Sequence, residues 1–200
     1  MTKTDAFKLE IVTLKDIPAI SQLWFAAFPD MEALFPNTPA MHQWWDDANR
    51  ADMIRKPFQR YLKVVDTHTL DERGRPRLVA YAKWDLSMPE ERGPRFPPWH
   101  ESQPALDCDT LFQGLESERA RVMGSRRHYY LDMLATHPEY RRRGAGSMLV
   151  KWGCDLADRE GVGAYVDASQ AGVPLYKKFG FVSRSQTGSD SLILSMARDI

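Results

Sequence analysis

The chain has 200 residues, 43% of them hydrophobic, and its 27 lysine and arginine residues balance 27 aspartate and glutamate residues. This length fits one domain with a sizeable hydrophobic core. The net charge of zero argues against a dedicated nucleic-acid-binding protein, because such proteins gain affinity by neutralising phosphates.

Cysteine and histidine positions give no sign of a metal site or a disulfide framework. Cys108 and Cys154 lie far apart, and the five histidines lack the close spacing of metal ligands. The first ten residues lack the apolar region of a signal peptide. No apolar run approaches the roughly 18 residues that span a bilayer. We therefore expect a cytoplasmic protein with no metal, no membrane contact and no nucleic-acid partner.

The N-terminal quarter predicts a strand followed by two helices. Alternating and β-branched residues predict a strand at 7–14. Apolar residues at helical spacing follow Asp16 and Pro18, which suit a helix start, and predict a helix over 16–28. Three prolines then interrupt the chain before a second helical pattern at 40–56.

The middle of the sequence predicts a hairpin and then an insertion. Segments 60–70 and 76–87 are rich in strand-forming residues and flank a turn that contains glycine. Segment 88–104 has five prolines, so we expect an irregular surface loop there. A helix is expected at 105–125. Loop and helix together form an insertion at about 88–126.

The last third alternates strands with helices. A strand, a helix and a second strand in succession imply a parallel pair within a mixed sheet. The expected order is a strand at 128–136, a helix at 144–161, a strand at 163–169, a short helix at 170–180, and strands at 181–186 and 190–198.

The stretch THPEYRRRGAGSMLVKW (136–152) has the features of an anion site. It places three arginines, 141–143, directly before a glycine-containing helix start. A helix N-terminus presents unpaired N–H groups and a positive dipole end. Gly144 and Gly146 add little bulk, so a phosphate can approach the backbone closely. A pyrophosphate fits this description.

Two familiar phosphate motifs do not fit this stretch. The dinucleotide motif needs a third glycine where Leu149 stands, and no lysine is placed as a P-loop requires. The pattern present is R-x-x-G-x-G. The alternative interpretation is a solvated basic turn before an ordinary helix.

Two linked motifs, LATHPEYRRRGAGSMLV and YVDASQAGVPLYKKFGF, resemble the GNAT superfamily of acyl-CoA-dependent N-acyltransferases, and most of all its fungal members. The core resemblance covers 129–182, and the element order extends it to nearly the whole chain. It implies one domain over 1–200 in the α/β (α+β) class. The expected sheet is mixed, mostly antiparallel and seven-stranded, flanked by helices, with a splayed V between the fourth and fifth strands.

The resemblance implies acetyl-CoA as cosubstrate, with no metal, and it assigns residues to the cofactor. The backbone of the glycine loop would hold the pyrophosphate, and the edge of strand 128–136 would pair with the pantetheine arm. Ser169 stands where the family often has an asparagine that contacts the cofactor, and Thr136 stands where an aliphatic residue is commoner. The implied cofactor-binding residues are Leu134, Ala135, Thr136, Arg141, Arg142, Arg143, Gly144, Ala145, Gly146, Ser147, Ser169 and Tyr176.

Two residues are candidates for catalysis. Tyr176 matches a family tyrosine that donates a proton to the departing CoA thiolate, and the alternative is a core tyrosine. Asp132 shares a strand face with Tyr130 and is a candidate general base. The alternative is a carboxylate paired with an arginine, because an unpaired buried carboxylate is costly. A backbone N–H near Leu134 would hold the oxyanion.

The implied reaction is transfer of an acetyl group to a primary amine by direct attack in a ternary complex. Residues 30–52 contain five acids and one arginine, and 85–109 contain six acids and two arginines. These acids predict a small cationic amine as acceptor. The alternative is a binding module that holds acyl-CoA without catalysis. We expect a monomer or a homodimer.

Overall fold

The computed structural model describes residues 6–185 and 193–199. In these ranges the strands are β1 (Phe7–Ile11), β2 (Gln59–Leu70), β3 (Pro76–Asp85), β4 (His128–Thr136), β5 (Gly163–Ser169), β6 (Val182–Ser183) and β7 (Ile193–Arg198). The helices are α1 (Ile17–Ala27), α2 (Pro39–Arg55), α3 (Ala105–Met123), α4 (Ala145–Glu160) and α5 (Val173–Lys177).

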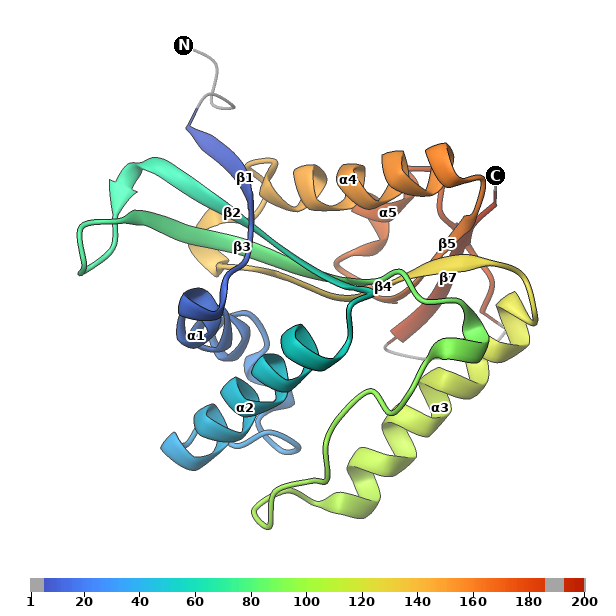
Figure 1. Cartoon of the computed structure of the whole chain (residues 1–200), viewed down its shortest axis with the longest axis horizontal. Helices are drawn as coiled ribbons and strands as arrows, with labels where there is room; N and C mark the ends of the chain where they lie inside the picture. Colours follow the sequence, from blue (N-terminus) through green and yellow to red (C-terminus); the bar gives the residue numbers. More distant parts are fainter. Residues whose placement is uncertain (1–5, 186–192, 200) are drawn as a thin grey trace.

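These strands form one sheet in the order β1-β2-β3-β4-β5-β7-β6. Only the β4–β5 pair is parallel among the described strands, because α4 returns the chain to the same end of the sheet. Helices α4 and α5 lie on one face, and α1, α2 and α3 lie on the other (Figure 1). The predicted mixed, mostly antiparallel seven-stranded sheet is confirmed.

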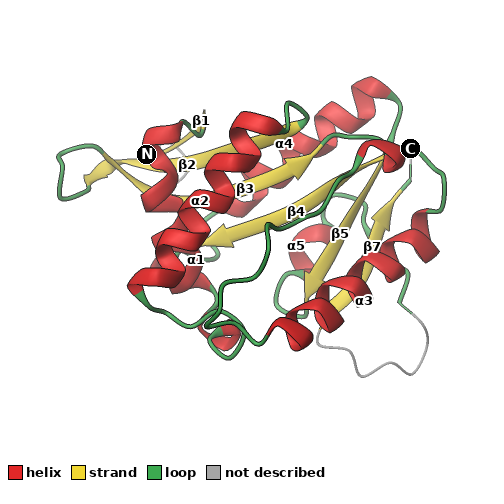
Figure 2. Ribbon diagram, turned by 60° about the horizontal axis from the view of Figure 1, so that its bottom comes forward, coloured by secondary structure: helices red, strands yellow, loops and turns green. Residues whose placement is uncertain are grey.

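The sheet opens between its two parallel strands. β4 pairs with β5 only from His128, opposite Gly163, to Leu131, opposite Val166. Beyond that point the strands diverge, as Figure 2 shows. The V predicted between the fourth and fifth strands is therefore present, and one edge of β4 has no strand partner from residue 132 onwards among the described residues.

A β-bulge lies on β4 beside the opening. On β3, Lys83 is opposite Met133 and Trp84 is opposite Leu131, which leaves Asp132 as the extra residue. A bulge bends its strand and redirects side chains. Here it places the Asp132 carboxylate on the face of the sheet that carries α1, α2 and α3, within reach of Lys83.

Several elements are shorter than the sequence predicts. α5 covers only part of 170–180, because Pro174 suits a first helical turn and Gly180 has a positive φ of 83° that ends the segment. β1 ends at Ile11, before a short 3-10 turn, and β6 is a two-residue strand. Residue 186 of the expected strand at 181–186 and residues 190–192 of the expected strand at 190–198 lie outside the described residues.

Candidate active site

The glycine loop has the geometry of an anion-binding helix start. Gly144 adopts a left-handed conformation with φ of 102°, which favours glycine, and α4 begins at the next residue. Met148 donates its N–H to the carbonyl of Gly144 at 3.2 Å. In the described part of the chain, no backbone carbonyl accepts from the N–H groups of Ala145, Gly146 and Ser147. These groups and the helix dipole can therefore hold an anion.

The glycine loop lies beside the open end of the V. A Cβ atom built on Gly146 would lie 3.2 Å from Leu175 Cδ2 and 3.7 Å from Thr136 Oγ1. Gly146 thus brings α4 close to both the end of β4 and α5. A side chain here would narrow the passage that the sequence assigns to the pantetheine arm.

The three arginines before the loop have different roles. The guanidinium of Arg141 donates to the carbonyl of Ala27 at 2.8 Å, and its backbone N–H donates to Pro138 at 3.3 Å. Arg141 therefore anchors the loop to the end of α1. Arg143 lies over the ring of Tyr140, 4.9 Å from its centroid. The cofactor contacts of all three arginines stay a prediction, although the Arg141 guanidinium already has an acceptor in Ala27.

Tyr176 lies on α5, close to the end of β5. Its ring meets Phe181 edge to face, with the centroids 5.9 Å apart. A Cβ atom on Gly172 would lie only 2.9 Å from the Tyr176 ring, so this glycine leaves room for it. Burial, followed by the charge of Asp167, raises the pKa of the Tyr176 phenol well above its ordinary value. The phenol is therefore protonated at neutral pH and has a proton to give.

Asp132 is buried and paired with two cations. Its carboxylate lies 2.6 Å from Arg95 Nε and 2.9 Å from Lys83 Nζ. Burial alone would raise the pKa of Asp132, but Arg95 and Lys83 outweigh it and lower the pKa to about 2. This is the paired arrangement that the sequence left as the alternative. It makes Asp132 a weak proton acceptor, and its role as base stays a prediction.

Asp167 is a carboxylate for which the sequence predicts no role. It follows Val166, the last β5 residue paired with β4. Tyr130 donates its hydroxyl to Asp167 Oδ2 at 2.7 Å, and Tyr165 donates to Oδ1 at 2.9 Å. Burial raises the pKa of Asp167, although these hydrogen bonds offset part of the rise. Asp167 alternates with apolar neighbours on a central strand. The same pattern identified Asp132 as a candidate and could have identified Asp167 from the sequence.

A cavity of about 590 Å³ lies on the face of the sheet that carries α3. Its walls come from the loop at 88–104, from α3 and from β3 and β4, and both Tyr130 and Asp132 line it. This volume lies in the range of small-molecule sites, about 300–1,000 Å³. The cavity is thus a candidate acceptor site.

The acidic entrance stays a prediction, and few of its acids line this cavity. Among the described residues, none of those lining the cavity comes from 30–52, although Asp52 of α2 pairs with Lys56 and Lys83, two lysines that line it. Of the six acids in 85–109, Asp85 and Asp109 line it, and both accept hydrogen bonds, from Ser87 and Trp99 respectively. The sequence shows charges along the chain, but it does not show which side chains face inward.

Two further properties concern the described ranges, 6–185 and 193–199. None of their helices is long and apolar enough to cross a membrane. Nor does any group of three histidine, cysteine, aspartate or glutamate side chains in these ranges gather in a way that could hold a metal ion.

A mixed sheet that opens between its parallel strands beside a glycine-containing helix start is the arrangement expected from the resemblance to acyl-CoA-dependent N-acyltransferases. The model of the acetyltransferase (GNAT) family matches residues 39–181, so the chain belongs to that family. The resemblance inferred from the two motifs is therefore confirmed, and with it an acetyl-CoA-dependent N-acetyltransferase.

Individual relatives agree with this assignment. An acetyltransferase from the fungus Stachybotrys chartarum is 26% identical over 182 residues, which cover 86% of this chain and 79% of that protein. A mosquito arylalkylamine N-acetyltransferase-like structure has a TM-score of 0.65 at 15% identity and covers 97% of this chain and 100% of its own. An N-acetyltransferase from Thermoplasma acidophilum in complex with coenzyme A has a TM-score of 0.59 at 11% identity, over 97% and 99%. These two structures share the fold.

Proposed function

We propose that this enzyme transfers the acetyl group of acetyl-CoA to a primary amine by direct attack in a ternary complex. One observation carries the proposal. The N-terminus of α4 and the 590 Å³ cavity lie on opposite faces of the sheet (Figure 1). Between them runs β4, which contributes Tyr130 and Asp132 to the cavity and has no partner in β5 beyond Leu131. A cofactor held at the glycine loop can therefore present its thioester to an acceptor in the cavity.

The chain supplies groups for each part of this reaction. The amine nitrogen forms a bond to the thioester carbonyl carbon, and the carbon–sulfur bond breaks. A backbone N–H near Leu134 would hold the oxyanion that forms in between. Tyr176 would give its proton to the departing thiolate. The pantetheine arm would lie along the unpartnered edge of β4 at 134–136, with Ser169 across the V.

The incoming amine is an ammonium ion at neutral pH, so its proton must leave before attack. The expectation of a small cationic amine rests instead on the acids at 30–52 and 85–109 and stays a prediction. Asp132 lines the cavity, but its low pKa makes it a weak acceptor. We favour Asp167, reached through the hydroxyl of Tyr130. That hydroxyl would take the proton of the amine and pass its own proton to the Asp167 carboxylate.

Replacing Asp167 by asparagine should lower kcat about a hundredfold at neutral pH, the low end of general-base effects. Because the pKa of Asp167 is raised, protonation on the acidic side removes the base, and kcat/KM of the parent enzyme should fall as the pH falls. The variant should lose that limb of the pH profile. Asp155→Asn, at an exposed carboxylate paired with Lys151, is the control. If the pH profile of kcat/KM is the same in the Asp167 variant as in the parent enzyme, Asp132 is the candidate general base instead.

A thermal melt tests the cofactor site itself. Acetyl-CoA at a hundred times its Kd should add about 2.7 kcal/mol, which is roughly 5–10 °C for a chain of this size. NADH and ATP are the controls and should give no comparable shift. Release of free thiol with a panel of amines then tests turnover. Absence of a shift with acetyl-CoA contradicts the proposal, whereas a shift without turnover of any amine supports the binding module.

Residues 1–200 form a single acetyltransferase domain in this proposal, with the loop and helix at about 88–126 as an insertion that completes the acceptor side. The walls of the cavity support this, since the insertion contributes most of them. A cytoplasmic location and a monomeric or homodimeric state stay predictions.

A further inference from the structure

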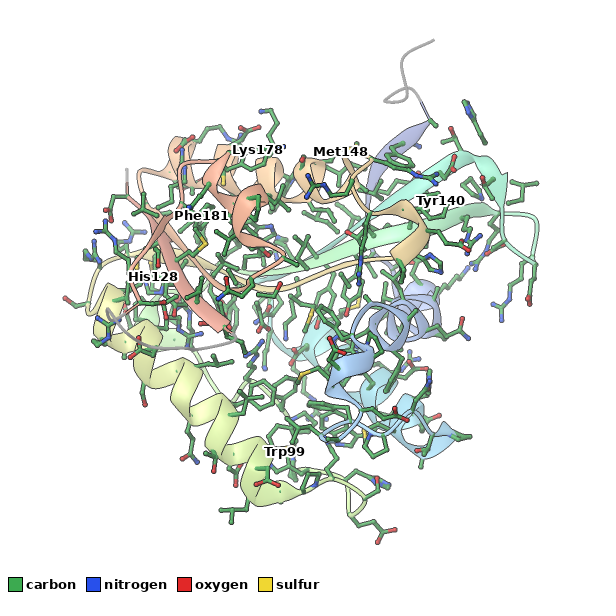
Figure 3. The ribbon with its side chains drawn as sticks, turned by 180° about the vertical axis from the view of Figure 1, so that it is seen from behind. Trp99, His128, Tyr140, Met148, Lys178 and Phe181 are labelled. Carbon is green, nitrogen blue, oxygen red and sulfur yellow. The ribbon has the colours of Figure 1, made fainter. Side chains whose placement is uncertain are left out.

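The inserted segment gives the cavity an aromatic wall. Phe96 and Trp99 from the loop meet Phe112 of α3, with ring centroids 4.7 Å and 5.7 Å from the Phe112 ring. Trp99 is fixed by a 2.7 Å hydrogen bond from its indole N–H to Asp109. Figure 3 shows Trp99 beside α3, among the side chains that fill the space toward α1 and α2. An acceptor in this cavity therefore contacts a largely apolar wall.

Most basic groups that line the cavity already have acceptors. Lys83 and Arg95 share the Asp132 carboxylate, at 2.9 Å and 2.6 Å. Arg92 donates to the carbonyl of His128 at 2.7 Å and to that of Ser87 at 3.0 Å. These cations hold the inserted loop against β3 and β4. They have little capacity left for a ligand.

The acidic side chains that line the cavity either have hydrogen-bond or ion-pair partners already or face solvent. Asp85 accepts from the backbone N–H of Ser87 at 2.8 Å, and Asp109 accepts from Trp99. Asp132 is paired twice. Glu116 faces solvent, with 73% of its side chain exposed. No buried carboxylate among the described residues that line the cavity is thus available for a second positive charge on the acceptor.

Arg119 of α3 differs from the other cations. Its side chain is 15% exposed, and its ion pair with Glu116 spans 3.9 Å. In the described part of the chain it makes no hydrogen bond. The guanidinium lies over the ring of Tyr130, with Cζ 4.4 Å from the centroid. A guanidinium over a ring face can keep the N–H groups at its edge available for a planar anion.

We propose that Arg119 binds a carboxylate of the acceptor, so that the substrate is an amine that also carries a carboxylate. Among the described residues, the guanidinium of Arg119 has no acceptor closer than Glu116 at 3.9 Å, and a carboxylate can accept two parallel hydrogen bonds from its edge. The same Tyr130 ring that supports Arg119 ends in the hydroxyl that bonds Asp167. The carboxylate would then lie at the edge of the guanidinium over Tyr130, and the amine near the Tyr130 hydroxyl. This inference rests on the proposed acetyl transfer.

The test compares pairs of amines that differ only in the carboxylate, beginning with phenylalanine and phenethylamine. The parent enzyme should acetylate phenylalanine with the higher kcat/KM. Arg119→Gln should reduce the ratio of the two kcat/KM values about 10–100-fold, mainly through KM for phenylalanine. Arg121→Gln on the same helix, where the arginine is exposed and pairs with Glu118 at 2.7 Å, is the matched control and should keep the parent ratio.

Three results would overturn the inference: a preference for amines without a carboxylate, a ratio that Arg119→Gln leaves unchanged, or no turnover of any carboxylate-bearing amine in the panel. The melt with acetyl-CoA is run on each variant. A normal cofactor shift shows that the variant folds, and it separates failure of this inference from failure of the proposed function. An enzyme with no cofactor shift and no turnover contradicts both.

Discussion

Replacing Tyr176 by phenylalanine is expected to lower kcat about a thousandfold, within the usual range for loss of a positioned proton donor. In this variant the CoA thiolate must leave without receiving a proton from residue 176. The ring itself is retained, so its packing against Phe181 and the space left by Gly172 are unchanged. KM for acetyl-CoA should therefore change little. Steady-state kinetics with a saturating amine measure both quantities.

Tyr129→Phe is the matched control for this experiment. Tyr129 is a buried tyrosine on the opposite side of β4 from Tyr130, packed in the core beneath α4. Loss of its hydroxyl should leave kcat within about twofold. If Tyr176→Phe behaves in the same way, Tyr176 is the core tyrosine of the alternative interpretation and another group supplies the proton.

Local patterns in the sequence are sufficient to predict most helices and strands of the fold. Apolar spacing predicts α1, α2 and α4, and the residue order in the glycine loop between β4 and α4 indicates an anion site. The opening between β4 and β5 follows only from the family resemblance. Nothing in the composition of those strands shows that their pairing stops at Leu131. Strand pairing depends on contacts between distant residues, which a single sequence does not display.

The interactions and pKa values of the site's side chains are harder to predict from the sequence, because they depend on partners that lie far along the chain. Asp16 was expected to cap α1, but its carboxylate accepts from the N–H of Thr13 and pairs with Lys63 at 2.8 Å. Asp132 and Asp167 give the same signal, a carboxylate on a central strand. The partners of Asp132 are two cations, whereas those of Asp167 are two neutral tyrosine hydroxyls. Their pKa values therefore shift in opposite directions.

Gly153→Ala should destabilise the fold by about 3 kcal/mol, the upper end of the usual cost of overpacking. A Cβ atom on Gly153 would lie 2.1 Å from a ring atom of Trp84, and the nearest atoms all belong to the indole. This ring is fully buried, and its N–H donates to the carbonyl of Leu149 at 3.2 Å. The indole cannot move aside without losing that bond, so α4 must shift away from the sheet.

A thermal melt measures this effect, and a fall in Tm of roughly 6–12 °C corresponds to it. Gly114→Ala in α3 is the control, because no atom lies within 4 Å of a Cβ built there. Alanine suits a helix interior better than glycine, so this variant should be unchanged or more stable by up to about 1 kcal/mol. Since α4 carries the glycine loop at its start, the Gly153 variant should also bind acetyl-CoA more weakly. Equal melting temperatures for the parent and Gly153→Ala would show that α4 does not rest on Trp84 as the structure places it.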